Sequence, residues 1–130
     1  TRSARRGRRV LMLLARRPDG HVFLQRRAEQ GIWGGLWSPP EFPDRTAARR
    51  FADATLRLPK LHRRALPAVQ HAFTHFELTI TPLVADCDGL AGVMDEGGAV
   101  WYNPAQPARI GLPAPIQKLL QQLADLPGAS

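Results

Sequence analysis

The sequence predicts an α+β fold, in which a mixed β-sheet has helices packed against it. Residues 76–80 alternate between apolar and polar side chains, which is the pattern of a strand with one buried face. Residues 47–58 and 116–126 instead carry apolar stripes at helical spacing. Predicted strands precede each of these helices, and this order of elements in a chain of single-domain length is typical of an α+β domain.

The N-terminal part is expected to contain a basic arm followed by a β-hairpin. Residues 1–9 include five arginines and little apolar content, which is typical of a linker or flexible arm. The apolar run at 10–17 predicts a buried strand, and 21–27 predicts a second strand. The sequence PDG at 18–20 supplies the turn between them, because proline presets φ and glycine accepts a positive φ.

A glycine- and tryptophan-rich connection, GIWGGLWSPP, occupies residues 31–40. It has neither the Gly-Lys-Ser/Thr ending of a P-loop nor the GxGxxG pattern of dinucleotide-binding folds. We interpret Trp33 and Trp37 as packing residues, with base stacking as the alternative.

The first helix is predicted at 47–58. Asp44 or Thr46 can cap its N-terminus, and Pro59 ends it. Its expected apolar face consists of residues spaced four, three and four positions apart, namely Ala47, Phe51, Ala54 and Leu58.

The C-terminal half begins with the alternating strand, which Pro82 is expected to end because proline cannot donate to a strand ladder. A glycine- and acid-rich loop at 86–98 and a short strand at 99–102 follow. Pro115 fits the first turn of the last helix. The apolar stripe of that helix is formed by Ile116, Leu119, Leu120 and Leu123.

Hydropathy and the cysteine count limit the classes of protein to which the chain can belong. The domain is placed at 10–126 with a tail at 127–130, and no apolar run is long enough for a membrane span. Cys87 is the single cysteine, so an internal disulfide and a cysteine cluster for zinc or iron–sulfur are excluded. A reducing, cytoplasmic location is the simplest interpretation.

Charge is distributed unevenly along the chain. Residues 1–65 carry sixteen Arg or Lys against five Asp or Glu, whereas 66–130 carry two against six, and the formal net charge is +7. A basic half favours a polyanionic partner such as nucleic acid, although a solvated, solubilising surface explains the same charge. Arg63 and Arg64 are candidates for contacts with a DNA backbone.

Three segments, in this order, resemble the MutT-like (Nudix-type) C-terminal domain of the A/G-specific adenine DNA glycosylases, the MutY family. They are QRR…GIWGGLWSPPEF at 25–42, HAFTHFEL at 71–78 and GLPAPIQKLLQQL at 111–123. The resemblance implies a Nudix fold that follows a helical catalytic domain holding a [4Fe–4S] cluster. It also implies recognition of 8-oxoguanine opposite adenine in double-stranded DNA during base excision repair, in the bacterial cytoplasm at the nucleoid.

The same resemblance allows a hydrolase to be considered. Nudix hydrolases share a box, G-x5-E-x7-R-E-U-x-E-E-x-G-U with U aliphatic, whose carboxylates hold Mg²⁺ against a pyrophosphate. Three positions match this box, namely Gly35, Glu41 and Arg49. The next position is Arg50 instead of glutamate, and the paired glutamates fall on Asp53 and Ala54.

We therefore expect the chain to have no catalytic residues and to hold no cofactor or metal of its own. Glu41 and Asp53 are interpreted as surface or salt-bridge residues. One cysteine cannot ligate an iron–sulfur cluster, so the glycosylase chemistry must lie elsewhere. The alternatives are a divergent Nudix hydrolase acting on an oxidised nucleoside diphosphate derivative and a protein-interaction module.

The expected binding site is Phe73, Thr74 and His75, with His71 beside it. In the family this position is a Phe-Ser-His loop that meets 8-oxoguanine, and here threonine replaces serine. The hydroxyl that could bond the lesion is retained. Phe73 could wedge against a base step or belong to the core, and His75 could reach phosphate. A zinc site at His71 and His75 is disfavoured because the segment is predicted to be a strand.

Overall fold

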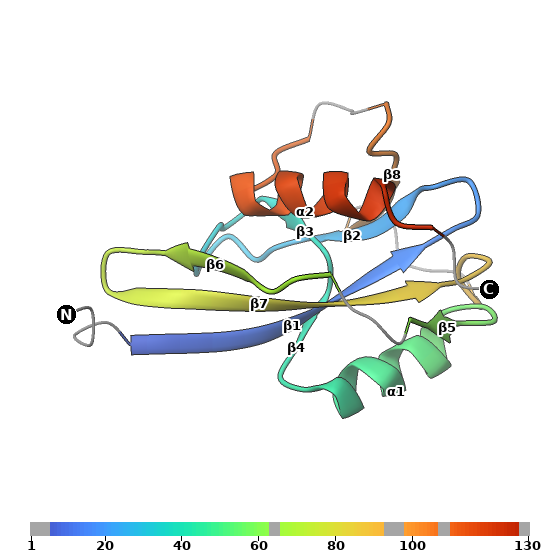
Figure 1. The fold of residues 1–130 in the computed structure, drawn as a ribbon, viewed down its shortest axis with the longest axis horizontal. Helices are drawn as coiled ribbons and strands as arrows, with labels where there is room; N and C mark the ends of the chain where they lie inside the picture. Colours follow the sequence, from blue (N-terminus) through green and yellow to red (C-terminus); the bar gives the residue numbers. More distant parts are fainter. Residues whose placement is uncertain (1–5, 63–65, 93–97, 107–109, 128–130) are drawn as a thin grey trace.

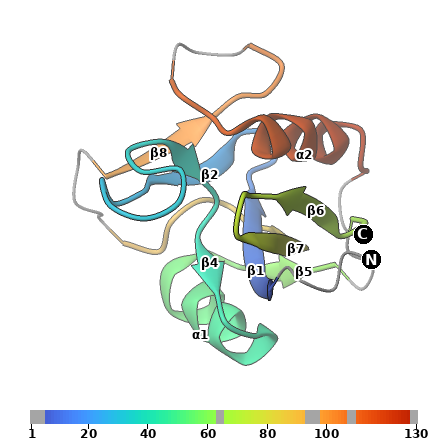
Figure 2. The same cartoon turned by 90° about the vertical axis from the view of Figure 1, so that its left-hand side faces the viewer.

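The computed structural model describes residues 6–62, 66–92, 98–106 and 110–127. Within them the chain forms one eight-stranded sheet and two helices on its opposite sides (Figures 1 and 2). No helix of this part is long and apolar enough to cross a membrane. The elements are β1 (Arg6–Arg16), β2 (Val22–Arg26), β3 (Trp37–Ser38), β4 (Glu41–Phe42), α1 (Arg45–Thr55), β5 (Lys60–Leu61), β6 (Val69–Ala72), β7 (Phe76–Asp86), β8 (Ala99–Tyr102) and α2 (Ala114–Ala124).

The centre of the sheet is the parallel pair β1 and β7. Their register runs without interruption from Arg6 opposite Phe76 to Arg16 opposite Asp86. The other strand pairs are antiparallel, and the path β3-β2-β1-β7-β5 is joined by β4 on β1, β6 on β7 and β8 on β2. The expected mixed sheet and its β1–β2 hairpin are therefore confirmed.

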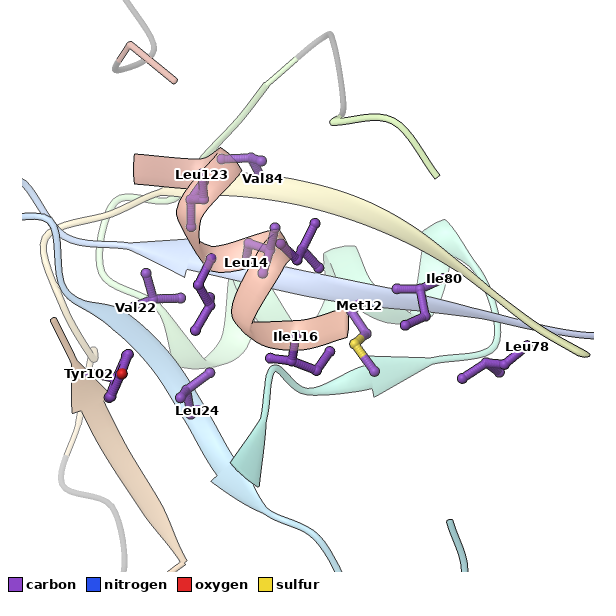
Figure 3. Packing of buried hydrophobic residues seen from close by; sticks show 12 residues of the cluster. Met12, Leu14, Val22, Leu24, Leu78, Ile80, Val84, Tyr102, Ile116 and Leu123 are labelled. Atoms are coloured by element: carbon purple, nitrogen blue, oxygen red, sulfur yellow. The ribbon is translucent and has the colours of Figure 1, made fainter. Parts of the chain in front are cut away.

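Alternation along the central strands separates two cores, because successive side chains of a strand point to opposite faces. The face beneath α2 holds the larger core, which is shown in Figure 3 and includes Met12, Leu14, Leu78, Ile80 and Val84. The opposite face packs against α1 and includes Leu13, Ala15, Leu83 and Ala85. The predicted α2 stripe is fully confirmed, since Ile116, Leu119, Leu120 and Leu123 are all buried.

Two expectations about strand ends are wrong. Strand β1 begins at Arg6, so the last four residues of the expected basic arm are strand, paired with the start of β7. Strand β7 continues through Pro82 to Asp86. Pro82 is tolerated on the edge of β7 that faces β5 and β6. Strand β6 pairs with β7 only as far as Ile80, and β5 pairs from Ala85 onward, so no described strand needs an N–H from residue 82.

The apolar face of α1 was predicted correctly only in part, because Phe51 packs against the core and Ala47 is half-buried, whereas Ala54 is exposed. Asp44 caps the helix by accepting from the N–H of Ala47, as expected, but the helix ends at Thr55 and buries Ala48 and Ala52. Leu58 lies beyond the helix with φ of 52° and is 70% exposed. Small alanines let α1 approach the sheet closely, and each of the two fully buried positions lies one residue after a predicted one.

Candidate nucleic-acid interface

Three of the four predicted site residues, Phe73, Thr74 and His75, form the turn of the β6–β7 hairpin, and His71 lies in β6 beside it. The two strands pair from Val69 opposite Ile80 to Ala72 opposite Glu77, and the N–H of Phe73 donates to the carbonyl of Phe76 at 2.8 Å. We call residues 73–75 of this hairpin the 73–75 turn. In Figure 1 it lies at the end of the sheet where β1 begins.

The structure divides the predicted residues into two groups. Thr74 and His75 are exposed at the tip, so the threonine hydroxyl and the imidazole can meet a ligand. His71 and Phe73 are half-buried beneath them. The segment around His71 is strand β6, as predicted.

An aromatic cluster supports the 73–75 turn. The rings of Phe73 and Phe76 stack with centroids 4.6 Å apart and an interplanar angle of 20°. His71 meets Phe73 edge-on at 4.8 Å, and Trp33 lies 5.5 Å from Phe73 and 5.7 Å from His71. Phe73 is thus committed to the core side of the turn, and these rings restrict how the exposed tip can move.

Trp33 is the contributor to this cluster that sequence reasoning missed. We interpreted it as a packing residue, and the structure confirms that it packs against the core beneath α2. Its place beside the 73–75 turn could not be inferred, because no sequence pattern links 31–40 to 71–76. Trp33 has φ of 54°, a left-handed conformation that is uncommon for a bulky residue and needs support from its surroundings.

Arg27 supplies much of that support. Its guanidinium lies 5.8 Å from the Trp33 ring centroid, and its Nε donates to the carbonyl of Ile32 at 3.1 Å. Its Nη1 donates to Ser38 Oγ at 3.1 Å and to Glu41 Oε1 at 2.9 Å. One arginine therefore fixes both the loop that carries Trp33 and the strand that follows it.

The loop also depends on glycine at position 34. A Cβ there would lie 2.0 Å from the carbonyl oxygen of Glu29, which no side chain can do without moving the backbone. Gly35 adopts a φ of 76°, in the region that glycine occupies at no steric cost. The Gly-Gly pair is therefore required by the shape of the loop.

The residues at the Nudix box positions do not form a carboxylate cluster. Arg49, Arg50, Asp53 and Ala54 are all exposed on α1. Glu41 is paired with Arg27, as expected of a salt-bridge residue. In the described part of the chain, no group of three or more His, Cys, Asp or Glu residues could hold a metal ion.

Three arginines lie beside the loop that carries Trp33. A cleft of about 370 Å³ is lined in part by Arg8, Arg26 and Arg27. Arg63 and Arg64, which the sequence offered as contacts to a DNA backbone, lie outside the described residues.

The sheet order, the two helices and the box-like segment from Gly35 into α1 define a MutT-like, Nudix-type α+β domain. The chain belongs to the NUDIX domain family, whose sequence model matches residues 11–122.

Within the NUDIX domain family, the chain resembles curated adenine DNA glycosylases. The adenine DNA glycosylase of Buchnera aphidicola subsp. Acyrthosiphon pisum is 29% identical over 107 residues, which is 79% of this chain but 29% of that relative. The adenine DNA glycosylase of the Baizongia pistaciae subspecies is 25% identical over 104 residues, again 79% of this chain and 29% of the relative. The chain thus spans less than a third of the length of these relatives.

Solved structures show the same fold. The C-terminal domain of mouse MUTYH, solved in complex with human PCNA, has a TM-score of 0.67 at 18% identity, covering 90% of this chain and 87% of that one. The Nudix hydrolase RenU from M. smegmatis has a TM-score of 0.59 at 24% identity, covering 97% and 90%. The resemblance to the C-terminal domain of the adenine DNA glycosylases is therefore confirmed, and hydrolases share its fold.

Proposed function

We propose that this chain is the lesion-recognition domain of an adenine DNA glycosylase, and that it binds DNA in which 8-oxoguanine lies opposite adenine. The observation that carries the proposal is the exposed Thr74 hydroxyl at a hairpin tip held by half-buried aromatic rings. Similarity to adenine DNA glycosylases over 79% of the chain supports it.

The chemistry of the lesion suits this tip. An oxidised guanine differs from guanine by an O8 acceptor and an N7–H donor, and a hydroxyl can both donate and accept. A hydroxyl held on a stiff turn can therefore discriminate the two bases at their differing edge. In this proposal His75, which is also exposed, binds a phosphate, whereas Phe73 and His71 hold the turn from beneath.

In this proposal the domain itself carries out no catalysis. Arg50 and Ala54 stand at box positions where a hydrolase needs metal-binding carboxylates, and an arginine repels a divalent cation. Cys87 is the single cysteine, so the chain does not fit a [4Fe–4S] cluster, which would belong to a separate catalytic domain of the same protein. That domain would be the partner that removes adenine.

The test compares Thr74→Ala with the matched control Thr74→Ser. Binding of the chain to duplexes with 8-oxoguanine·A or G·A is measured by fluorescence anisotropy, and adenine excision is measured in the glycosylase that carries the domain. We expect Thr74→Ala to lose about 1–2 kcal/mol of preference for the lesion, as for one hydrogen bond, and Thr74→Ser to keep it. A folded Phe73→Ala/Thr74→Ala variant with full lesion preference would refute the assignment.

The competing hydrolase function has its own assay. We expect no Mg²⁺- or Mn²⁺-dependent pyrophosphate release from 8-oxo-dGTP or related nucleoside diphosphate derivatives. Turnover above background that disappears in Glu41→Gln would establish the hydrolase instead.

A further inference from the structure

Arg8 lies between the 73–75 turn and the basic cleft. It belongs to β1 opposite Leu78, and its guanidinium carbon lies 5.1 Å from the ring centroid of Phe76. Phe76 in turn stacks on Phe73, so Arg8 is one ring removed from the turn. The same arginine lines the cleft of about 370 Å³.

Of the three arginines at this cleft, Arg8 alone has no acidic partner in the described part of the chain. Arg27 is paired with Glu41 at 2.9 Å, and Arg26 is paired with Glu29 at 2.8 Å. The side chain of Arg8 makes no hydrogen bond or ion pair with any described residue. The two carboxylates are thus neutralised, and one exposed positive charge is left over at the rim of the cleft.

Stacking on Phe76 leaves the donors of Arg8 available. A guanidinium that lies over an aromatic ring still has its five N–H groups in its own plane, where they can grip a phosphate in a two-pronged manner. The ring also limits the rotamers of the arginine, so less entropy is lost when a ligand binds.

Strand alternation gives this arginine a matched control. Arg8 shares the face of the sheet that carries Leu78 and Ile80 beneath α2. Arg9, its neighbour, points to the opposite face, towards the side of α1. Both are exposed and equally charged, but only Arg8 lines the cleft.

We propose that Arg8 binds a backbone phosphate of the DNA strand whose base meets the 73–75 turn. The proposal rests on the proposed function and adds to it the site that positions the duplex. A phosphate contact fixes register and orientation without reading sequence, so Arg8 would set where the turn lands on the strand.

The experiment compares Arg8→Gln with Arg9→Gln in the chain, with folding checked by circular dichroism. Anisotropy is measured on 8-oxoguanine·A and undamaged duplexes between 50 and 200 mM salt. We expect Arg8→Gln to bind both duplexes roughly tenfold more weakly, as for one lost charge-assisted hydrogen-bonding group. The slope of log K against log salt should also fall by about 0.9, the value for one phosphate contact. Arg9→Gln should change both quantities much less.

The outcomes separate the two proposals. If Arg8→Gln and Arg9→Gln are equivalent while Thr74→Ala loses lesion preference, the phosphate site is wrong and the lesion-recognition function stands. If Arg8→Gln lowers lesion preference instead of overall affinity, Arg8 acts by shaping the turn through Phe76, and the phosphate site is again wrong. Absence of binding to any duplex at 50 mM salt would contradict the proposed function itself.

Discussion

Replacing Arg16 with methionine should destabilise the domain more than any single surface change. Arg16 is 8% exposed, and its Nε donates to Asp86 Oδ1 at 2.8 Å. Its Nη1 donates to the carbonyls of Leu123 at 3.0 Å and Leu126 at 2.6 Å, and its Nη2 donates to that of Pro127 at 3.0 Å. The guanidinium thus joins the central sheet to the C-terminal end of α2, where the negative end of the helix dipole favours a cation.

The size of the loss in unfolding free energy depends on the half-buried Asp86 carboxylate that Arg16→Met leaves without its arginine. Breaking a buried ion pair costs about 3–5 kcal/mol. We expect a value near the lower end, ~3 kcal/mol, because Asp86 is 23% exposed and keeps a 2.8 Å contact with His62. Such a loss would lower Tm by about 10 °C in a domain of this size.

Urea unfolding followed by circular dichroism measures the effect, with Arg17→Met as the control. Arg17 is paired with Asp19, but the two side chains are 29% and 50% exposed, so its removal should cost less than about 1 kcal/mol. Free energies of unfolding that agree for the two variants would show that the guanidinium does not hold α2, and would refute the reasoning.

Three further predictions follow from single residues. Gly34→Ala should cost about 1–3 kcal/mol of stability, as overpacking does, and should also lower lesion preference. Gly92→Ala has open space at its Cβ and should change neither quantity. Unfolding assays measure the stability, and duplex-binding assays measure the preference. Burial raises the pKa of the Cys87 thiol, so iodoacetamide should alkylate it far more slowly in the native chain than in urea, and equal rates would contradict this. Hydrogen bonds from Arg17 and the His21 N–H lower the pKa of Asp19 from 3.8 to about 2. The stabilisation that this carboxylate gives the fold is therefore present above pH 3.8 and is lost as pH falls towards 2. The Asp19→Asn variant should lose less stability over that interval than the unchanged chain does.

The main elements could be predicted because their patterns are local. Alternation at 76–80 and the stripe of α2 depend on which face each residue presents, and both are confirmed. The limits of β7 could not be inferred, because proline ends a strand only where a neighbour needs its N–H, and that depends on β5 and β6. The sequence predicts an arm at residues 6–9 because the strand with which they pair lies far along the chain.

The candidate site could likewise be predicted only where its signal is local in the sequence. The resemblance of HAFTHFEL to a known loop singled out Thr74, and the structure places it at an exposed hairpin tip, although its role stays a prediction. The aromatic support beneath it combines rings from two distant segments, the hairpin residues 71–76 and the loop that carries Trp33, and no spacing rule joins these segments. The contact of Arg8 with Phe76 likewise depends on the pairing of β1 with β7, which no local pattern predicts.

The long parallel pairing of β1 with β7 also has a kinetic consequence. Each of its residue pairs joins positions as far apart as Arg16 and Asp86, which are separated by 70 residues. Closing so long a loop must precede the contacts that reward it, and chains rich in such pairings fold slowly, in milliseconds to seconds. The β6–β7 hairpin can form early by itself, but Arg8 and Trp33 reach it only when the distant segments dock. We therefore expect the surface that we propose to meet the lesion to be among the last parts of the domain to become complete.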